Sequence, residues 1–194
     1  MPFPPQNWWM EVVQSNKLHI DLEEHFEKMS YRNKYKISGA NNAIMLSIPL
    51  EKGRDQRTPV KLVRISNTTD WQVQHWRSLE SAYRNTPYWE FYAPHLEILF
   101  KQTFSYLHEF NSKSIDLCLK MLKNKIEITP TSEYRKDWGD ACKDLRNMKP
   151  SHDGSVETPR YTQIFEDRLG FINNLSILDL LMMEGPAALS ILSR

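Results

Sequence analysis

Residues 25–50 constrain the fold of this chain most strongly, because residues typical of turns stand there between two runs of residues typical of strands. The segment 37–44 reads Ile-Ser-Gly-Ala-Asn-Asn-Ala-Ile, in which glycine and asparagine favour a tight reversal of the backbone. This pattern predicts a β-hairpin whose first strand includes residues 31–34. The second strand, 44–48, ends at Pro49, since proline has no N–H group to donate to a central ladder.

Polar and basic side chains crowd on the first strand of this hairpin. Alternation along the strand sends Tyr31, Asn33 and Tyr35 to one face and Arg32, Lys34 and Lys36 to the other. Basic groups of this kind hold phosphate or carboxylate, so we predict that Lys28, Arg32 and Lys34 bind an anion. The alternative is a basic strand face that is simply exposed to solvent.

Up to residue 65 the chain is mostly of β type. Residues 18–22 alternate between apolar and polar side chains, which predicts a half-buried strand, and residues 60–65 repeat that alternation. His19 and Asp21 share one face of the first of these strands, and His25 follows them. No second cluster supplies the remaining ligands of a metal ion, so we predict no metal site.

From residue 67 onward, apolar residues recur at steps of three and four, which is typical of helices that pack on one face. We expect helices over 6–15 and 70–83, two helices beginning at Thr86-Pro87 and Ala93-Pro94, and another beginning at Asn111. A further helix is capped by Asn174 or by Ser176, which has Asp179 at capping-box spacing. Residues 126–129 predict a strand that returns to the sheet through a crossover connection. The irregular segment 131–158 is expected to be either mobile or functional.

These elements predict a single α+β (or α/β) domain over residues 1–194. A mixed β-sheet comes from the N-terminal third of the chain and the returning strand, and the central and C-terminal helices cover it. A length of 194 residues fits one domain, because domains commonly have about 100–200 residues.

The charge balance limits the classes of partner that the chain can bind. It has 25 basic and 24 acidic side chains and a formal net charge of +1, which gives little support to binding of nucleic acid. No apolar run approaches the roughly 18 residues of a membrane span, and the first residues show no secretion signal. Cys118 and Cys142 fit no metal spacing and are typical of reduced thiols, so we expect a cytoplasmic protein. No glycine-rich phosphate loop is present, and the sequence identifies no cofactor.

Several segments, in a fixed order along the chain, resemble one known family. They are Pro4-Pro5 before aromatic residues, Leu18-His-Ile-Asp21, the run from Phe26 to Ile37, Leu46-Ser-Ile-Pro49, Trp71 with His75, the Tyr83-to-Pro87 segment, and Tyr161–Phe165 followed by Gly170-Phe171 and Asn174–Leu181. Together they resemble the WbqC-like protein family. The resemblance implies a link to gene clusters for O-antigen and other surface polysaccharides, without an assigned reaction. Many relatives have arginine where this chain has Lys34, and lysine lacks the planar, two-pronged donor of arginine.

Two histidines are candidates for a general base, because the unperturbed pKa of histidine lies nearest to neutrality. They are His25, which precedes the hairpin, and His75, which stands next to Trp76. A histidine beside tryptophan is also typical of a packed, hydrogen-bonded structural group, so this alternative stays open for His75. Tyr88 and Trp89 can stack on a sugar ring, whereas helical spacing favours the core for most other aromatic residues nearby.

The leading hypothesis is a cytoplasmic enzyme of surface-polysaccharide biosynthesis that transfers a group to an activated sugar or from an acyl or aminoacyl donor. The predicted substrate-binding residues, which would hold a nucleotide-sugar or another anionic small molecule, are Lys28, Tyr31, Arg32, Asn33, Lys34 and Trp89, and the predicted catalytic residues are His25 and His75. The alternative is a non-catalytic accessory protein of the same pathway that binds a glycan or a protein. The enzymatic hypothesis requires the basic groups and an imidazole to meet in one hollow.

Overall fold

The computed structural model describes residues 1–51, 57–139 and 142–194. In these ranges the helices are α1 (Gln6–Val13), α2 (Trp71–Tyr83), α3 (Trp89–Phe100), α4 (Leu107–Leu122), α5 (Glu166–Leu169), α6 (Ile177–Glu184) and α7 (Ala188–Leu192). The strands are β1 (Lys17–Ile20), β2 (Lys34–Ile37), β3 (Ile44–Ser47) and β4 (Glu127–Pro130). Short 3₁₀ helices are η1 (Tyr31–Asn33), η2 (Val60–Leu62), η3 (Pro150–Ser155) and η4 (Gly185–Ala187).

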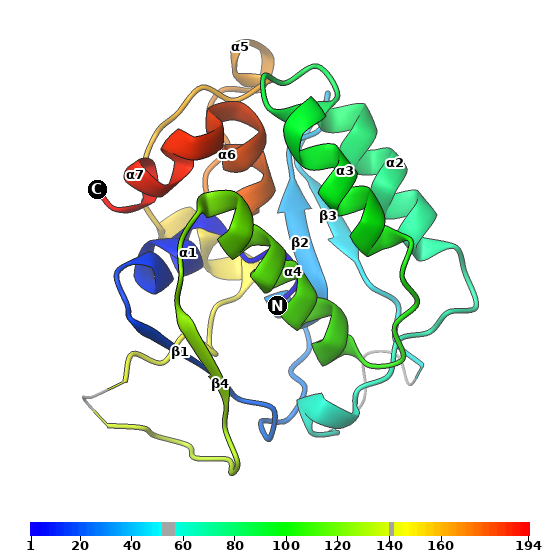
Figure 1. Cartoon of the computed structure of the whole chain (residues 1–194), viewed down its shortest axis with the longest axis vertical. Helices are drawn as coiled ribbons and strands as arrows, with labels where there is room; N and C mark the ends of the chain where they lie inside the picture. The colour runs from blue at the N-terminus through cyan, green and yellow to red at the C-terminus, as the bar shows by residue number, and fades with distance from the viewer. Residues whose placement is uncertain (52–56, 140–141) are drawn as a thin grey trace.

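The strands form two separate pairs in the part of the chain that the structure describes. β1 and β4 are parallel, with Leu18 opposite Ile128, whereas β2 and β3 are antiparallel, with Tyr35 opposite Leu46. Helices α2, α3 and α4 stand between β1 and β4 in the sequence, so a long crossover joins this pair (Figure 1). These features confirm the α+β class and the returning strand. The expected mixed sheet is divided into one parallel and one antiparallel pair.

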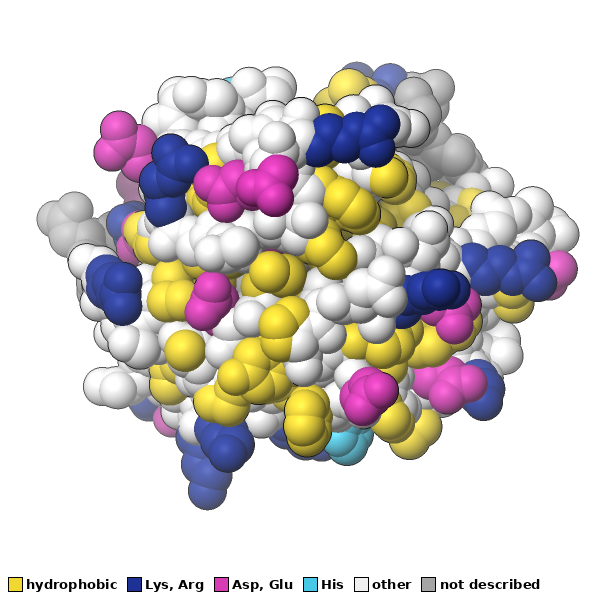
Figure 2. Space-filling view, turned by 90° about the horizontal axis from the view of Figure 1, so that it is seen from above, with side chains coloured by type: hydrophobic (Ala, Val, Ile, Leu, Met, Phe, Trp, Pro, Cys, Tyr) yellow, Lys and Arg dark blue, Asp and Glu magenta, His cyan; other side chains and the backbone are white. Residues whose placement is uncertain are grey.

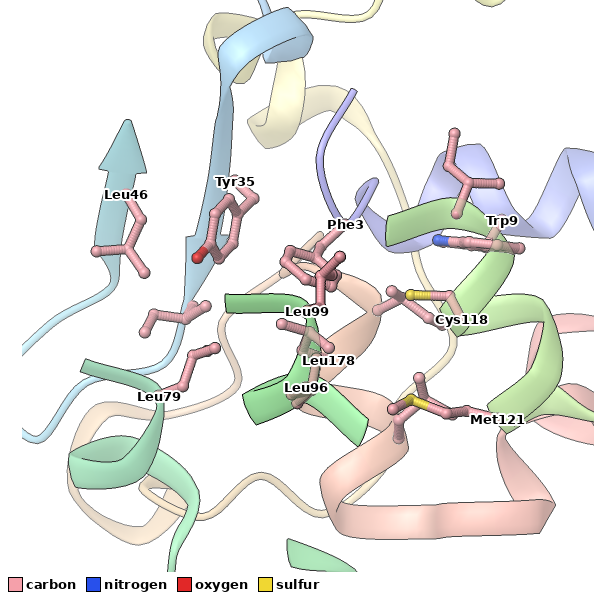
Figure 3. Close-up of a cluster of buried hydrophobic side chains, with 14 of the residues drawn as sticks. Phe3, Trp9, Tyr35, Leu46, Leu79, Leu96, Leu99, Cys118, Met121 and Leu178 are labelled. Atoms are coloured by element: carbon pink, nitrogen blue, oxygen red, sulfur yellow. The ribbon is translucent and has the colours of Figure 1, made fainter. Parts of the chain in front are cut away.

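The apolar faces of the helices and strands meet around the N-terminal segment. Figure 3 shows Phe3 in the middle of the core, with labelled side chains from β2, α3, α4 and α6 around it. The centroid of its ring lies 5.1 Å from that of Tyr35, 6.0 Å from that of Phe100 and 5.9 Å from that of Phe110. Full burial of a side chain of this size contributes about 1.5–3 kcal/mol. We propose that residues 1–194 form one domain, because this core joins the first residues to α6.

The predicted hairpin is present, but its first strand begins later than the sequence indicated. Tyr31–Asn33 form η1 ahead of β2, so the predicted strand position of these three residues is wrong. The cause is Ser30, whose hydroxyl accepts a hydrogen bond from the backbone N–H of Arg32 at 3.3 Å and thereby favours a turn. From Lys34 onward the side chains alternate as expected, with Tyr35 buried and Lys34 half-buried.

Residues 60–65 do not form the predicted strand. They begin with η2, in which the N–H of Val60 donates to the carbonyl oxygen of Glu24 at 2.8 Å. Isolated bridges such as Leu50–Ile65 follow. The backbone donors of this segment therefore hold the loop around Glu24 instead of extending a ladder.

Two of the predicted helices are a single helix. Helices beginning at Thr86-Pro87 and at Ala93-Pro94 were expected, whereas α3 runs from Trp89 to Phe100 with Pro94 inside it. Proline lacks the N–H that would bond to the carbonyl oxygen of Glu90, and Glu90 is exposed, so water can bind that oxygen. The helix therefore tolerates a proline that the sequence indicated as a boundary.

Helix α4 begins one turn earlier than the sequence indicated. Its first residue is Leu107, whereas the expected start was Asn111. The side chain of Glu109 accepts a hydrogen bond from the backbone N–H of Tyr106 at 2.9 Å. This capping contact satisfies a free donor at the helix end and starts the helix ahead of Asn111.

Helix α6 places one carboxylate in the core. Asp179 is fully buried, and its oxygen atoms accept hydrogen bonds from the hydroxyls of Tyr83 at 2.9 Å and Tyr161 at 2.6 Å. The expected capping role of Asp179 is therefore replaced by a core contact, and Ser176 caps the helix by accepting from the N–H of Leu178. Burial raises the pKa of Asp179 to about 6, although both hydroxyls favour the charged form.

We predict that the substitution Asp179→Asn removes one pH-dependent part of the stability. The pKa of this carboxyl rises from 3.8 to about 6 on folding, so the group favours folding below pH 3.8 and loses that contribution as the pH rises through 6. Relative to the variant, the natural protein should lose roughly 2–3 kcal/mol of unfolding free energy between about pH 4 and pH 7. Urea unfolding of both proteins measures the difference, and a difference that does not change with pH contradicts the prediction.

Candidate functional site

A cavity of about 630 Å³ lies between α1, β1, α4 and the segment 142–146. In Figure 1, α1 and the β1–β4 pair lie on the same side of the molecule, next to α4. Volumes of about 300–1,000 Å³ are typical of small-molecule sites. This cavity is therefore the first candidate for a functional site.

The apolar wall of the cavity is formed by one face of each surrounding element. Trp8 and Val12 stand four residues apart on α1, and Leu18 and Ile20 stand two residues apart on β1. Ile115 completes this wall from α4. The periodicities of a helix and a strand place residues at these spacings on one face, so the wall follows from the apolar pattern of the sequence.

Arg32 marks the polar end of the cavity, near the first turns of α4, where the side-chain amide of Asn111 donates to the carbonyl oxygen of Arg32 at 2.9 Å. Its guanidinium binds Glu24 in two places, from Nε to Oε1 at 3.0 Å and from Nη2 to Oε2 at 2.5 Å. Nη1 donates to Glu27 at 3.3 Å. Burial raises the pKa of Glu24, against the opposite effect of Arg32. A two-pronged pair of this kind fixes the plane of the guanidinium.

Arg146 lines the same cavity from the irregular segment. Its guanidinium donates to Asp21, just after β1, at 2.7 Å and to Asp144 at 2.7 Å. It also donates to the carbonyl oxygens of Arg135 at 2.8 Å and Lys136 at 3.1 Å. The hydrogen bonds from Arg146 lower the pKa of Asp144. Arg146 thus fastens the irregular segment to the end of β1, where that segment forms one side of the cavity.

His108 lines the cavity from the first turn of α4. Its ring stacks on that of Tyr106, with the centroids 5.8 Å apart. Burial lowers the pKa of His108, although the carboxylate of Glu109 acts in the opposite direction. The imidazole is therefore neutral near pH 7 and can accept a proton. His19 also lines the cavity, and its Nδ1 lies 2.7 Å from the hydroxyl of Thr129.

A smaller hollow of about 290 Å³, which we call the side hollow, adjoins the cavity, because Glu24, Arg32 and Arg146 line both. His25 and Tyr134 also line it, with their ring centroids 6.5 Å apart. His25 is exposed to solvent. The structure therefore brings two of the predicted site residues, Arg32 and His25, to one hollow.

His75 lies in the core and lines neither the cavity nor the side hollow. Its side chain is buried, its Nδ1 lies 3.0 Å from the hydroxyl of Tyr35, and its ring packs edge-on against Trp71 with centroids 5.1 Å apart. Burial lowers the pKa of His75 to about 4. This position matches the structural alternative for His75 and gives its ring no contact with either space.

Tyr31 and Asn33 hold segments of the chain together. The hydroxyl of Tyr31 donates to Asp153 at 2.6 Å, which fastens η3 to η1. The side-chain amide of Asn33 donates to the carbonyl oxygen of Ile48 at 2.9 Å, just beyond β3. Neither of these two predicted binding residues lines the cavity or the side hollow.

The other predicted binding residues also lie outside the lining of both spaces. Lys28 is exposed, and Lys34 is half-buried on β2. Trp89 is half-buried and stacks on Trp76, with their ring centroids 5.4 Å apart. Of the predicted cations, only Arg32 reaches the cavity.

The cavity brings together titratable groups that the sequence did not mark as a site, namely Glu24, His108 and Arg146. No spacing rule connects them, because they come from a loop, a helix and an irregular segment that meet only in the folded chain. One signal was available for Arg146. It belongs to the irregular segment 131–158, which was expected to be mobile or functional.

The face of the molecule shown in Figure 2 mixes side chains of both charges with apolar groups. No broad area of one sign is visible on this face, so it lacks the basic stripe that is typical of nucleic-acid interfaces. Among the helices that the structure describes, none is long and apolar enough to cross a bilayer. No group of three or more metal-binding side chains occurs in the described ranges.

The fold and the cavity define an α+β protein with a site that has an apolar wall and is bounded at one end by two arginine–carboxylate clusters. Residues 2–152 match the model of the WbqC-like protein family, and the chain belongs to that family. The matched residues include both strand pairs, every residue that lines the side hollow and, except for Met1, every residue that lines the cavity. The resembling segments from Tyr161 onward lie beyond the match. No curated protein and no solved structure matches the chain.

We predict that the imidazole of His75 stays neutral at every pH above about 5. Its pKa falls from 6.5 to about 4 on folding, so its contribution to stability is complete above pH 6.5 and is lost as the pH falls through 4. This loss amounts to about 3 kcal/mol of unfolding free energy. An NMR titration of the histidine side chains measures the protonation, and His75→Gln identifies the signal by its disappearance. A titration of that signal near pH 6.5 contradicts the prediction.

Proposed function

We propose that this protein is a cytoplasmic group transferase of surface-polysaccharide biosynthesis that acts on an activated sugar or on an acyl or aminoacyl donor. The observation that best supports a reaction on a small molecule is the fixed Arg32–Glu24 pair at the polar end of the 630 Å³ cavity. Sites of this kind combine an apolar wall with a few polar groups that orient the ligand. The resemblance to the WbqC-like family supports the choice of pathway.

An anionic donor such as a nucleotide-sugar can reach Arg32 from the side hollow. Glu27, which accepts from Nη1 of Arg32, lines this hollow and has a side chain that is 40% exposed. Rotation of Glu27 toward solvent frees one edge of the guanidinium, while Glu24 keeps the other edge in place. A phosphate or carboxylate then replaces Glu27. Lys149, which pairs with Glu27, supplies a second positive charge there, and Lys28 follows Glu27 in the sequence.

We assign the proton-accepting role to His108. It lines the cavity, and its lowered pKa keeps the imidazole neutral near pH 7, which a general base requires. His25, the other candidate, is exposed and lines the side hollow together with Arg32. Proton transfer to His108 would take place in the cavity, whereas proton transfer to His25 would take place in the side hollow. The cavity is the larger and more enclosed of these two spaces.

We predict that His108→Gln lowers the rate of transfer by about 10²–10⁴-fold, because it removes a proton acceptor but keeps a polar side chain of similar size. His25→Gln is the matched control, with the same substitution at the side hollow, and should change the rate by less than about threefold. The assay incubates the protein with UDP-glucosamine and the acetyl, octanoyl or glycyl thioester of N-acetylcysteamine. Mass spectrometry follows the gain in mass of the sugar nucleotide.

The two variants separate the possible results. A loss of rate in His25→Gln alone moves the reaction to the side hollow and contradicts the role of His108. An absence of product with every donor, together with binding of the sugar nucleotide, contradicts transferase activity and supports the accessory function. Thermal unfolding of both variants shows whether a lost rate reflects a lost fold.

The second candidate is a non-catalytic accessory protein that binds a glycan or a protein of the same pathway. It is favoured by the complete pairing of Arg32 and Arg146 with carboxylates, which is typical of structural ion pairs. In that case the side hollow recognises its partner by shape, and no bond is made or broken.

A further inference from the structure

We infer that the apolar wall of the cavity binds a medium-length aliphatic acyl chain, presented by a thioester donor. This inference rests on the proposed function for its assignment of the chain to a donor. It goes beyond the proposed function in two respects. The donor is an acyl donor and not a sugar or aminoacyl donor, and the cavity recognises the aliphatic chain of that donor.

The order of residues along β1 and α4 separates the two ends of the cavity. On β1, Leu18 and Ile20 line the cavity together with Lys17 and His19. Asp21 follows at the end of the strand, where Arg146 binds it at 2.7 Å. On α4, Asn111 contacts Arg32, while Ile115 lies one turn further along the helix. The arginines therefore bound one end of the cavity, the apolar wall lies next to them, and polar residues that include Ser15, Asn16 and Lys17 line the other end.

The apolar wall is unsuited to contact with a sugar ring or a phosphate. A hexose has hydroxyl groups on all sides, and each one that is buried without a partner costs free energy. The wall formed by Trp8, Val12, Leu18, Ile20 and Ile115 offers no side-chain group that could accept a hydrogen bond. An aliphatic chain has no such requirement, and its burial is favourable in proportion to its area.

The charged groups around the cavity also favour a neutral ligand. Arg32 and Arg146 are paired with Glu24 and Asp21, and at the rim Lys143 pairs with Glu11 at 2.6 Å. A carboxylate or an ammonium group placed beside these pairs meets charges of both signs and gains little. A thioester carries no charge, and its carbonyl oxygen can accept a hydrogen bond at the polar end.

The extent of the apolar wall favours a longer chain over a short one. A water molecule takes about 30 Å³ of liquid, and an acetyl group is only a few times larger. An acetyl or glycyl group would therefore leave most of the 630 Å³ empty or wet. A chain of roughly eight carbons covers much more of the apolar wall.

Calorimetric titration of the full chain with acetyl, butanoyl, hexanoyl and octanoyl thioesters of N-acetylcysteamine tests this inference. Each buried methylene raises affinity about fourfold, so each two-carbon step should raise it at least about tenfold. An affinity that is the same for the acetyl and octanoyl compounds overturns the inference. Octanoate and octylamine, titrated in parallel, should bind at least about tenfold more weakly than the octanoyl thioester, and equal or tighter binding of either overturns the thioester assignment.

Two substitutions at apolar positions in the cavity lining locate the binding. Ile115→Trp and Leu145→Trp should each weaken octanoyl binding by at least about tenfold and leave acetyl binding within about twofold. Leu145 is half-buried in the irregular segment, so its variant keeps the test valid if Ile115→Trp does not fold. Ile98→Trp is the matched control, because it makes the same change at a position on α3 that is 61% exposed. Equal loss in the control, or no loss in either cavity variant of normal thermal stability, overturns the location.

These measurements detect binding alone, so they separate this inference from the proposed function. Binding that strengthens with chain length, without any transfer product, supports the acyl site and contradicts the transferase. A transfer product whose yield and donor affinity do not depend on chain length supports the transferase and overturns the acyl site.

Discussion

The buried contact between Arg32 and Glu24 is the interaction on which the arrangement around the cavity depends. It joins the loop that follows β1 to η1, and η1 is held to α4 because Asn111 donates to the carbonyl oxygen of Arg32. Removing one partner from a buried pair of this kind costs about 3–5 kcal/mol, because the other charge is left without compensation. The same two residues line both the cavity and the side hollow, so the fold of this region and the binding of a ligand both depend on this pair.

Positive and negative side chains nearly balance, both around the cavity and in the whole chain. The arginines that face the cavity are matched by carboxylates, as 25 basic side chains are matched by 24 acidic ones in the chain. Such a protein has little long-range attraction for a charged ligand, and its selectivity has to come from contact and shape. This explains why charge alone, read from the hairpin, was a poor guide to the functional site.

Local patterns predicted α1, β1, β4 and α6, because alternation or a cap within a few residues determines each of them. The division of the sheet and the presence of His108 and Arg32 in one cavity depend on contacts between distant segments, which no local pattern contains. For His75 a signal was present: Trp71, His75 and Leu79 recur every four residues, the spacing of one helical face, and all three are buried. The histidine follows the core pattern of its helix.

The parallel pairing of β1 with β4 has a consequence for the synthesis of this protein. His19 and Thr129, which face each other across the pair, are separated by 110 residues. Translation at about 5–20 residues per second therefore leaves β1 without its partner for several seconds to about twenty seconds. During that time the apolar face of the nascent strand is open to chaperones and to other unfinished chains. The face of β1 that later lines the cavity therefore needs protection from these contacts until β4 pairs with β1.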